Sequence, residues 1–258
     1  MCFMVSARSI VTFTTDFGLA DAYVAQMKAA VLRQCPEATL VDITHLVPPQ
    51  DILAGSIALE RAIAAFSPKT IHVAVVDPGV GTNRRLLLVR INGQIVLCPD
   101  NGIITWPHRR HGPAEFAELL WRPPEKVSAT FHGRDILAPA AGCIASGDSI
   151  KPLAKSIDDP ILLDIALAKT LQSGRIIYID HFGNAITNIP SEFLHGRNGP
   201  TVRAAHSPEI PLCETYSGVA AGKSLALIGS ADLLEIAVRN GSAAQQLSLK
   251  VGDEVTFA

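Results

Sequence analysis

Residues 39–76, TLVDITHLVPPQDILAGSIALERAIAAFSPKTIHVAVV, hold the alternation of elements that decides the fold. A β-branched run at residues 39–43 precedes an amphipathic helical pattern at residues 52–66, and an apolar run at residues 71–76 follows. Helices that alternate with such runs are typical of layered α/β proteins. This stretch therefore predicts an α/β fold with a mostly parallel central sheet.

The flanking sequence extends this pattern in both directions. Upstream, a strand-like run at residues 10–13 is followed by a helical pattern at residues 23–32. Downstream, the runs at residues 86–91 and 95–98 flank Asn92-Gly93. This pair readily adopts positive φ and is a strong hairpin signal. We therefore expect the far part of the sheet to be antiparallel.

The sequence changes character after a short alanine-rich helix predicted at residues 134–145. The next segment, residues 151–164, has two prolines and several charges and marks the domain boundary. Beyond it lie short strand-like runs separated by Gly, Pro and Asn turns, at residues 175–180, 201–204, 224–228, 247–251 and 254–257. The pattern predicts an N-terminal α/β domain at residues 1–160 and a smaller all-β domain, a barrel or a sandwich, at residues 161–258.

Composition argues against two classes of partner. The 258 residues carry 22 basic and 24 acidic side chains without a block of five like charges, so nucleic acid is not expected as a partner. No apolar stretch approaches the roughly 20 residues that span a bilayer. Residues 1–8 also lack a signal-peptide pattern, so no membrane association is expected.

The five cysteines are odd in number, widely spaced and without a C-x-x-C pair. This arrangement argues against both a disulfide framework and a zinc site. We expect reduced, mostly buried thiols and a cytoplasmic location. Cys98, beside the turn at residues 99–101, is the one thiol whose position merits attention.

Four polar clusters follow predicted strands, which is where open α/β sheets bind ligands. They are TTDFG at residues 14–18, DPGVGT at residues 77–82 with Arg84, PDNG at residues 99–102, and FHGRD at residues 131–135. Asp77 ends an apolar run, and the glycines after it let the backbone approach a ligand. Asp77 is equally well explained as the cap of a turn. His132 likewise suits either a cleft or a structural role.

The motifs present favour water activation over phosphate or metal binding. Neither G-x-G-x-x-G nor a Walker A lysine occurs, which disfavours a phosphate-binding loop at residues 77–82. An Asp, an Arg and a His from separate loop ends would suit activation of water, whereas a metal site usually needs more ligands at defined spacing. His45 is a weaker candidate, and residues 107–112 look like a solvated loop without a specific role.

In the second domain, DHFGNAITN at residues 180–188 combines an acid, an aromatic ring and two amides. An ordinary hairpin with Asx turns explains this composition. A pocket wall explains it too, with amides pairing to a purine edge and Phe182 stacking on it. The residues alone leave both explanations open.

Taken together, these motifs resemble one family. TTDFG, VVDPGVGTNRR at residues 75–85, PDNG, FHGRD and DHFGNAITN resemble the S-adenosylmethionine (SAM) hydroxide adenosyltransferases, relatives of the SAM-dependent fluorinase and chlorinase. The likeness extends from about residue 10 to residues 234–238 and 251–254. It implies an α/β domain, a C-terminal β-barrel, and a homotrimer whose sites lie between the N-terminal domain of one subunit and the C-terminal domain of its neighbour.

For activity, the resemblance implies a SAM hydrolase in which water or hydroxide attacks C5′ of SAM and gives adenosine and methionine, without a cofactor or a metal. The family's water-activating residues match Asp77, Arg84 and His132. Whether Asp77 or His132 takes the proton stays open. The halogenase relatives carry a tyrosine in place of Asp77, and an anionic Asp77 would repel halide. A SAM or adenosine sensor with negligible turnover and a SAM-dependent halogenase are the alternatives.

The substrate contacts implied by the resemblance come from both domains. Asp16 would accept the ribose hydroxyls, Asp180 would bind the methionine ammonium, and Asn184 would face the adenine edge. The halogenases have an arginine where this chain has Ala231, so the methionine carboxylate has no assigned partner. The full substrate-binding set is Asp16, Phe17, Phe131, Asp180, Phe182, Asn184, Ser230, Glu235 and Val238.

Overall fold

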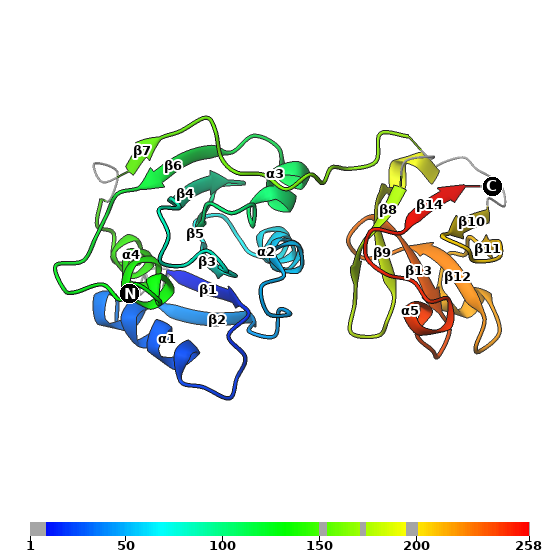
Figure 1. Cartoon of the computed structure of the whole chain (residues 1–258), viewed down its shortest axis with the longest axis horizontal. Coiled ribbons are helices and arrows are strands. Elements are labelled where there is room, and N and C mark those ends of the chain that lie inside the picture. The colour runs from blue at the N-terminus through cyan, green and yellow to red at the C-terminus, as the bar shows by residue number, and fades with distance from the viewer. Residues whose placement is uncertain (1–8, 150–153, 171–173, 195–200, 258) are drawn as a thin grey trace, which may run out of the picture. The chain divides into compact units, whose positions relative to one another are not determined.

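The computed structural model describes residues 9–149, 154–170, 174–194 and 201–257. The chain divides into two compact units, Met1–Ile165 and Ala166–Ala258 (Figure 1). The first contains β1 (Ile10–Thr15), α1 (Tyr23–Gln34), β2 (Thr39–Thr44), α2 (Ile52–Ala65), β3 (Ile71–Val75), β4 (Leu86–Ile91), β5 (Gln94–Pro99), α3 (Thr105–His111), β6 (Glu115–Leu119), the π-helix η1 (Gly133–Leu137), α4 (Ala138–Ala145) and β7 (Ala154–Ser156). The second contains β8 (Gly174–Ile179), β9 (Ala185–Pro190), the 3₁₀ helix η3 (Ser191–Leu194), β10 (Thr201–Ala204), β11 (Ile210–Pro211), the 3₁₀ helix η4 (Tyr216–Gly218), β12 (Ser224–Ile228), β13 (Leu233–Val238), α5 (Ala243–Gln246) and β14 (Glu254–Phe257).

The sheet of the first unit has the order β2-β1-β3-β5-β4-β6-β7. Strands β2, β1, β3 and β5 run parallel, and β4, β6 and β7 continue the sheet in antiparallel pairings. The predicted mostly parallel sheet is therefore confirmed for the half that carries β1 and β3. The turn from β4 to β5 has positive φ at Asn92 (50°) and Gly93 (71°), as a tight hairpin turn requires.

Helices cover both faces of this sheet (Figure 1). Val11 and Phe13 of β1 belong to the apolar cluster formed with α1 and α4, whereas Thr12, on the opposite face, contacts His72 of β3. Helices α1 and α4 approach closely at Gly142, where a Cβ atom would lie 2.7 Å from the Val31 carbonyl oxygen. The parallel strands β1, β3 and β5 are thus mostly buried, as their apolar sequences require, whereas the edge strand β2 is partly exposed.

The second unit is built on antiparallel strands in the order β11-β10-β14-β8-β9-β13-β12. The ends of this order also meet, because Leu212 bridges Ala226 of β12 and the Cys213 amide donates to the Ala226 carbonyl at 2.8 Å. The sheet is therefore curled into a nearly closed barrel around its own apolar core. The prediction of a smaller all-β domain is confirmed.

Two local predictions are wrong. Residues 247–251 are not a strand: the Leu247 and Leu249 amides donate to carbonyls of α5, and the chain then turns, with φ of 55° at Ser248. Residues 107–112 are not a solvated loop, because most of them form α3. His111 Nε2 of that helix lies 3.2 Å from the buried Glu60 carboxylate of α2.

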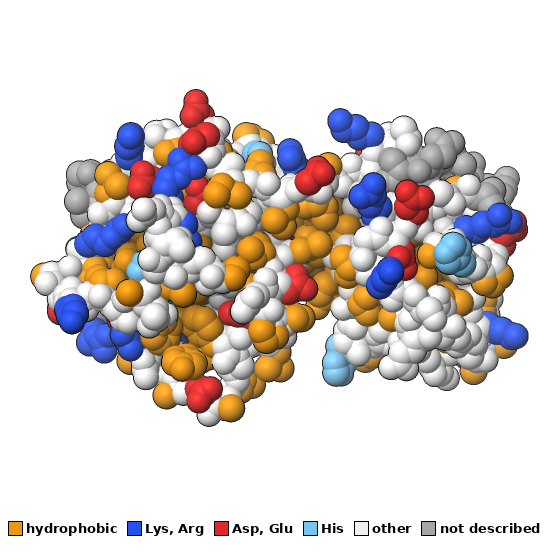
Figure 2. Space-filling model, viewed as in Figure 1, with side chains coloured by type: hydrophobic (Ala, Val, Ile, Leu, Met, Phe, Trp, Pro, Cys, Tyr) orange, Lys and Arg blue, Asp and Glu red, His pale blue; other side chains and the backbone are white. Residues whose placement is uncertain are grey.

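The surface has mixed charge. Basic and acidic side chains intermingle on the face shown in Figure 2, as the balanced composition predicts. Within the described part of the chain, no helix is both long enough and apolar enough to cross a bilayer.

A buried polar network ties the centre of the sheet to α2. His72 of β3 is fully buried; its Nδ1 lies 2.7 Å from Thr12 Oγ1, and its Nε2 contacts Gln94 Oε1. Gln94 Nε2 donates to the carbonyls of Ile63 (2.8 Å) and Phe66 (3.0 Å). Because the Gln94 amide nitrogen is the donor, its oxygen accepts from His72 Nε2–H, and His72 Nδ1 accepts from Thr12. Burial lowers the pKa of His72, which favours this neutral form.

The change Gln94→Leu should lower the free energy of unfolding by about 2–4 kcal/mol, because it leaves two helix-terminal carbonyls and the His72 N–H buried without partners. Urea unfolding followed by circular dichroism measures the loss. Arg90→Ala is the control: Arg90 lies on neighbouring β4, its side chain is 45% exposed, and its removal should cost less than about 0.5 kcal/mol. Equal losses in the two variants would contradict the structural role of the network.

Candidate active site

A pocket of about 300 Å³ opens at the carboxyl ends of β1 and β3. This is the edge of a parallel sheet where loops from neighbouring strands converge. Four segments that are distant in the sequence supply its wall: the loops after β1, β2 and β3, and the residues at the start of η1. The lining residues are Asp16, Phe17, Gln50, Val75, Asp77, Pro78, Val80, Thr130, Phe131, His132 and Gly133.

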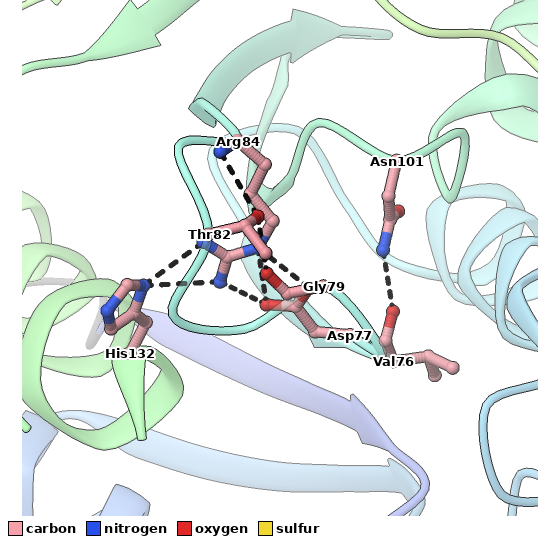
Figure 3. Close-up of polar contacts among 7 residues, drawn as sticks. All are labelled: Val76, Asp77, Gly79, Thr82, Arg84, Asn101 and His132. Carbon is pink, nitrogen blue, oxygen red and sulfur yellow. Dashed lines mark hydrogen bonds and ion pairs between the residues drawn. The ribbon is translucent and has the colours of Figure 1, made fainter. Parts of the chain in front are cut away.

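Asp77 and Arg84 form a buried ion pair beside this pocket (Figure 3). Arg84 Nε donates to Asp77 Oδ1 at 2.7 Å and to Oδ2 at 2.9 Å, and Nη2 also contacts Oδ2. The two side chains are only 6% and 8% exposed. A charged pair in this setting is strongly held, since separating it would leave two buried charges without partners.

The turn between the two charges brings them together. Val80 N donates to Asp77 O at 3.2 Å, and the Thr82 hydroxyl donates to Gly79 O at 2.8 Å. At Gly81 φ is +83°, and a Cβ atom there would lie 2.7 Å from the Ala129 carbonyl oxygen. Only glycine fits both requirements, which explains the residue at position 81.

His132 completes the group from the start of η1. Its Nδ1 lies 3.1 Å from Arg84 Nη1 and 3.2 Å from Nη2 (Figure 3). A guanidinium only donates, so Nδ1 accepts and the ring carries its proton on Nε2. Burial, followed by the positive charge of Arg84, lowers the pKa of His132 below its usual value. The histidine is therefore held neutral with an N–H donor at Nε2.

The PDNG motif does not line the pocket. Its side chains instead hold neighbouring segments of the chain in place. Asn101 Nδ2 donates to the carbonyl of Val76 at 2.8 Å, which fixes the peptide just before Asp77 (Figure 3). Asp100 is 2% exposed and accepts from Arg85 Nε (2.7 Å) and from the Ile161 amide (2.8 Å). Asn101 braces the Asp77 loop, and Asp100 anchors the segment that leaves the first unit.

Asp16 and an aromatic cluster form the other side of the pocket. Asp16 Oδ2 accepts from the Gln50 amide at 2.8 Å. The rings of Phe17 and Phe131 meet edge to face with centroids 5.5 Å apart, and Tyr23 contacts both rings. The sequence placed Asp16, Phe17 and Phe131 in a site. It gave no reason to single out Gln50 or Tyr23, because their roles depend on how two loops cross.

In the second unit, Asp180 and Asn184 are bonded to each other. Asp180 Oδ1 accepts from the amides of Phe182 (2.9 Å) and Asn184 (2.8 Å), and Oδ2 accepts from Asn184 Nδ2 at 3.0 Å. The Asx turn, one of the two explanations that the sequence left open, is therefore present. Phe182, at the tip of this turn, is 74% exposed, so its ring projects from its own unit.

The remaining predicted residues of the second unit lie on or beside β12 and β13. Glu235 is 8% exposed, and its Oε1 accepts from the Tyr216 hydroxyl at 2.6 Å. Burial and the Glu235 carboxylate raise the pKa of Tyr216, which keeps it a hydroxyl donor. Ser230 is exposed in the turn between the strands, whereas the Val238 side chain is packed in the core. Tyr216 was missed because no motif surrounds it.

Cys98 is a free, buried thiol. Burial together with the Asp100 charge raises its pKa, so this thiol is unreactive. Cys35, Cys143 and Cys213 are also free, and Cys2 lies outside the described residues. Among the described side chains, no three His, Cys, Asp or Glu groups are close enough to hold a metal ion.

Comparison with known proteins places both units in one family. Residues 11–154 match the SAM hydroxide adenosyltransferase N-terminal domain, and residues 174–256 match the corresponding C-terminal domain. The chain is 38% identical to the (R)-S-adenosyl-L-methionine hydrolase of Thermus thermophilus, over 94% of this chain and 96% of that protein. It is 27% identical to a fluorinase from Nocardia brasiliensis, over 96% of each chain.

Solved structures agree with this placement. An uncharacterized conserved protein from Thermotoga maritima superposes with a TM-score of 0.88 at 34% identity, over 96% of this chain and all of that one. Since the matched domains cover most of the sequence in the same order, the chain belongs to the SAM hydroxide adenosyltransferase family.

Proposed function

We propose that this protein hydrolyses SAM, with water attacking C5′ and adenosine and methionine leaving as products. The observation that carries the proposal is the buried Asp77, Arg84 and His132 group beside a pocket that also exposes Asp16. The curated relatives named (R)-S-adenosyl-L-methionine hydrolase support the same reaction. Their names specify the R epimer at sulfur, so we propose (R)-SAM as the preferred substrate.

The chemistry needs an activated nucleophile and no leaving-group acid. Displacement of the sulfonium releases a neutral thioether, so the leaving methionine requires no proton. Water has a pKa near 15.7 and is a poor nucleophile, so the site must take its proton as the new C5′–O bond forms. The developing hydroxide and the sulfonium neutralise each other in the transition state, which a partly buried pocket favours.

The geometry favours Asp77 as the proton acceptor. His132 Nδ1 already accepts from Arg84, so the neutral ring offers only an N–H at Nε2. Asp77 Oδ1 accepts only from Arg84 Nε and keeps a lone pair, whereas Oδ2 accepts from both Nε and Nη2. In this scheme His132 donates a hydrogen bond to the attacking oxygen. Arg84 bonds to both Asp77 and His132 and fixes their positions relative to each other.

Substrate recognition would use both units. Asp16 has one oxygen held by the Gln50 amide and the other available to the ribose hydroxyls, beside the rings of Phe17 and Phe131. The Asp180 and Glu235 carboxylates suit the ammonium end of methionine, Asn184 the adenine edge, and Val238 contributes through its backbone. We propose that Phe182 and Ser230, both exposed, complete the pocket of a neighbouring subunit in a homotrimer.

Two other functions are weaker. A halogenase must bind a halide ion at the pocket, and the anionic Asp77 would repel it. A sensor would use the same pocket without turnover, and only product analysis separates it from a hydrolase. We also propose that the reaction needs no added cofactor or metal and takes place in the cytoplasm, where free thiols such as Cys35 stay reduced.

Purified protein incubated with SAM in EDTA should release adenosine and methionine in equal amounts, faster from the R than from the S epimer at sulfur. Liquid chromatography of the nucleosides, with and without chloride, measures this. 5′-Chloroadenosine would identify a halogenase, and unchanged SAM despite measurable binding would identify a sensor.

Asp77→Asn should lower kcat by about 10²–10⁴-fold with little change in SAM affinity, because the amide cannot accept the proton. His132→Gln should keep far more activity, because its amide still donates to the nucleophile.

As pH falls through the lowered pKa of His132, an imidazolium forms beside Arg84. Wild-type kcat should therefore be flat above pH 6.5 and fall below it, and the Gln variant should lose this acid limb.

The control is Glu115→Gln on β6, where the side chain is 80% exposed; it should match the wild type. An inactive His132→Gln variant together with an active Asp77→Asn variant would reverse the assignment and make the histidine the base.

Whether two subunits build each active site together can be tested by combining two variants. Asp77→Asn and Asp180→Ala variants should each be impaired alone, since they damage different units. Co-expressed with separate tags and purified through both, they should regain about a third of wild-type activity per site, because a trimer that contains both chains has one interface in three that pairs two intact units. No gain over the single variants would show that each site is built within one chain.

A further inference from the structure

A chain of hydrogen bonds and ion pairs runs from α1 to the loop that carries Asp16 and Phe17. Lys28 Nζ of α1 lies 2.6 Å from Asp42 Oδ2, and Asp42 Oδ1 lies 2.9 Å from His45 Nε2. His45 Nδ1 lies 2.8 Å from Thr15 Oγ1, which accepts from the Phe17 amide at 3.3 Å. Thr15 is fully buried and His45 is 3% exposed, so the inner part of this chain is shielded from water.

The partners fix the direction of each bond. The Asp42 carboxylate only accepts, so the His45 Nε2 that faces it in the ion-pair contact carries a proton, and when the ring is neutral Nδ1 is the acceptor. Thr15 then donates its hydroxyl proton to His45 and accepts the Phe17 N–H with a lone pair. Although burial alone raises the pKa of Asp42, the bonds from Lys28 and His45 hold it below its usual value, so this end of the chain is anionic.

Backbone contacts join the same two loops. The Gly18 amide donates to the His45 carbonyl at 2.8 Å, and the Gln50 amide donates to Asp16 Oδ2 at 2.8 Å. Gln50 has a φ of 66°, a conformation that aims this amide at the carboxylate and that a non-glycine residue rarely adopts. The loop after β2 therefore supports the loop after β1 on both sides of Asp16.

Thr15, His45 and Asp42 are absent from the pocket wall, so they act only through the residues they hold. We propose that Asp42, His45 and Thr15 form a positioning relay that fixes Asp16 and Phe17 for the nucleoside part of the substrate. This inference rests on the proposed function. Because the relay lies on the nucleoside side and not beside Asp77, its loss weakens binding and leaves the chemical step largely intact.

Thr15→Val tests the relay, and its neighbour provides a matched control. Thr14 is also buried on β1, and its hydroxyl has no hydrogen-bond partner among the described residues. Thr15→Val should raise KM for SAM and Kd for adenosine about tenfold, with kcat changed less than about threefold. Thr14→Val should leave all three values unchanged. Thr15→Ser, which keeps the hydroxyl, should restore KM and Kd.

Asp42→Asn is the second variant, since Asp42 is 40% exposed and its replacement is tolerated more easily by the fold. It should raise KM and adenosine Kd about threefold at unchanged kcat. The relay is overturned if Thr15→Val behaves like Thr14→Val, if kcat falls while KM stays constant, or if Asp42→Asn has no effect on either affinity. If wild-type protein binds adenosine but does not turn SAM over, the proposed function fails. The adenosine Kd values of the Thr14, Thr15 and Asp42 variants would still show whether the relay positions the nucleoside site.

Discussion

Asp77 and Arg84 are opposite charges placed where water barely reaches them, and each would cost several kcal/mol to bury alone. The surrounding sequence is arranged so that neither is alone. The glycine-containing turn after β3 returns the chain to Asp77, Asn101 fixes the peptide before it, and His132 accepts from the outer edge of the guanidinium. The tautomer of His132 follows from this one ion pair. The proposed roles of Asp77 as proton acceptor and of His132 as hydrogen-bond donor follow from it as well.

Much of the fold follows from local patterns in the sequence. The alternation in residues 39–76 fixed two parallel strands and the helix between them, and Asn92-Gly93 marked the hairpin. The errors arose where tertiary contacts outweigh local pattern. Residues 247–251 alternate in polarity like a strand, yet their amides bond back to α5. The His and Arg residues of α3 read as solvent-exposed because nothing nearby in sequence reveals the buried Glu60 carboxylate.

Some residues of the candidate site can likewise be predicted from the sequence, and others cannot. Asp16, Asp77, Phe131 and His132 line one pocket because each follows a strand or begins a helix at the same sheet edge, which sequence position can indicate. Partners such as Tyr216 and Gln50 come from loops whose crossings the sequence does not specify. The PDNG motif also shows that a segment near a site need not face the ligand, since its side chains hold backbone.

The meeting of Leu212 and Cys213 with β12 has a consequence for the behaviour of the protein at high concentration. An open sheet ends in rows of unpaired amides and carbonyls that can template pairing with another molecule. Here the outermost strands of the second unit satisfy part of that need with each other. The barrel is thereby shielded against edge-to-edge aggregation, so its contacts with other chains depend on side chains and exposed loops rather than on strand addition.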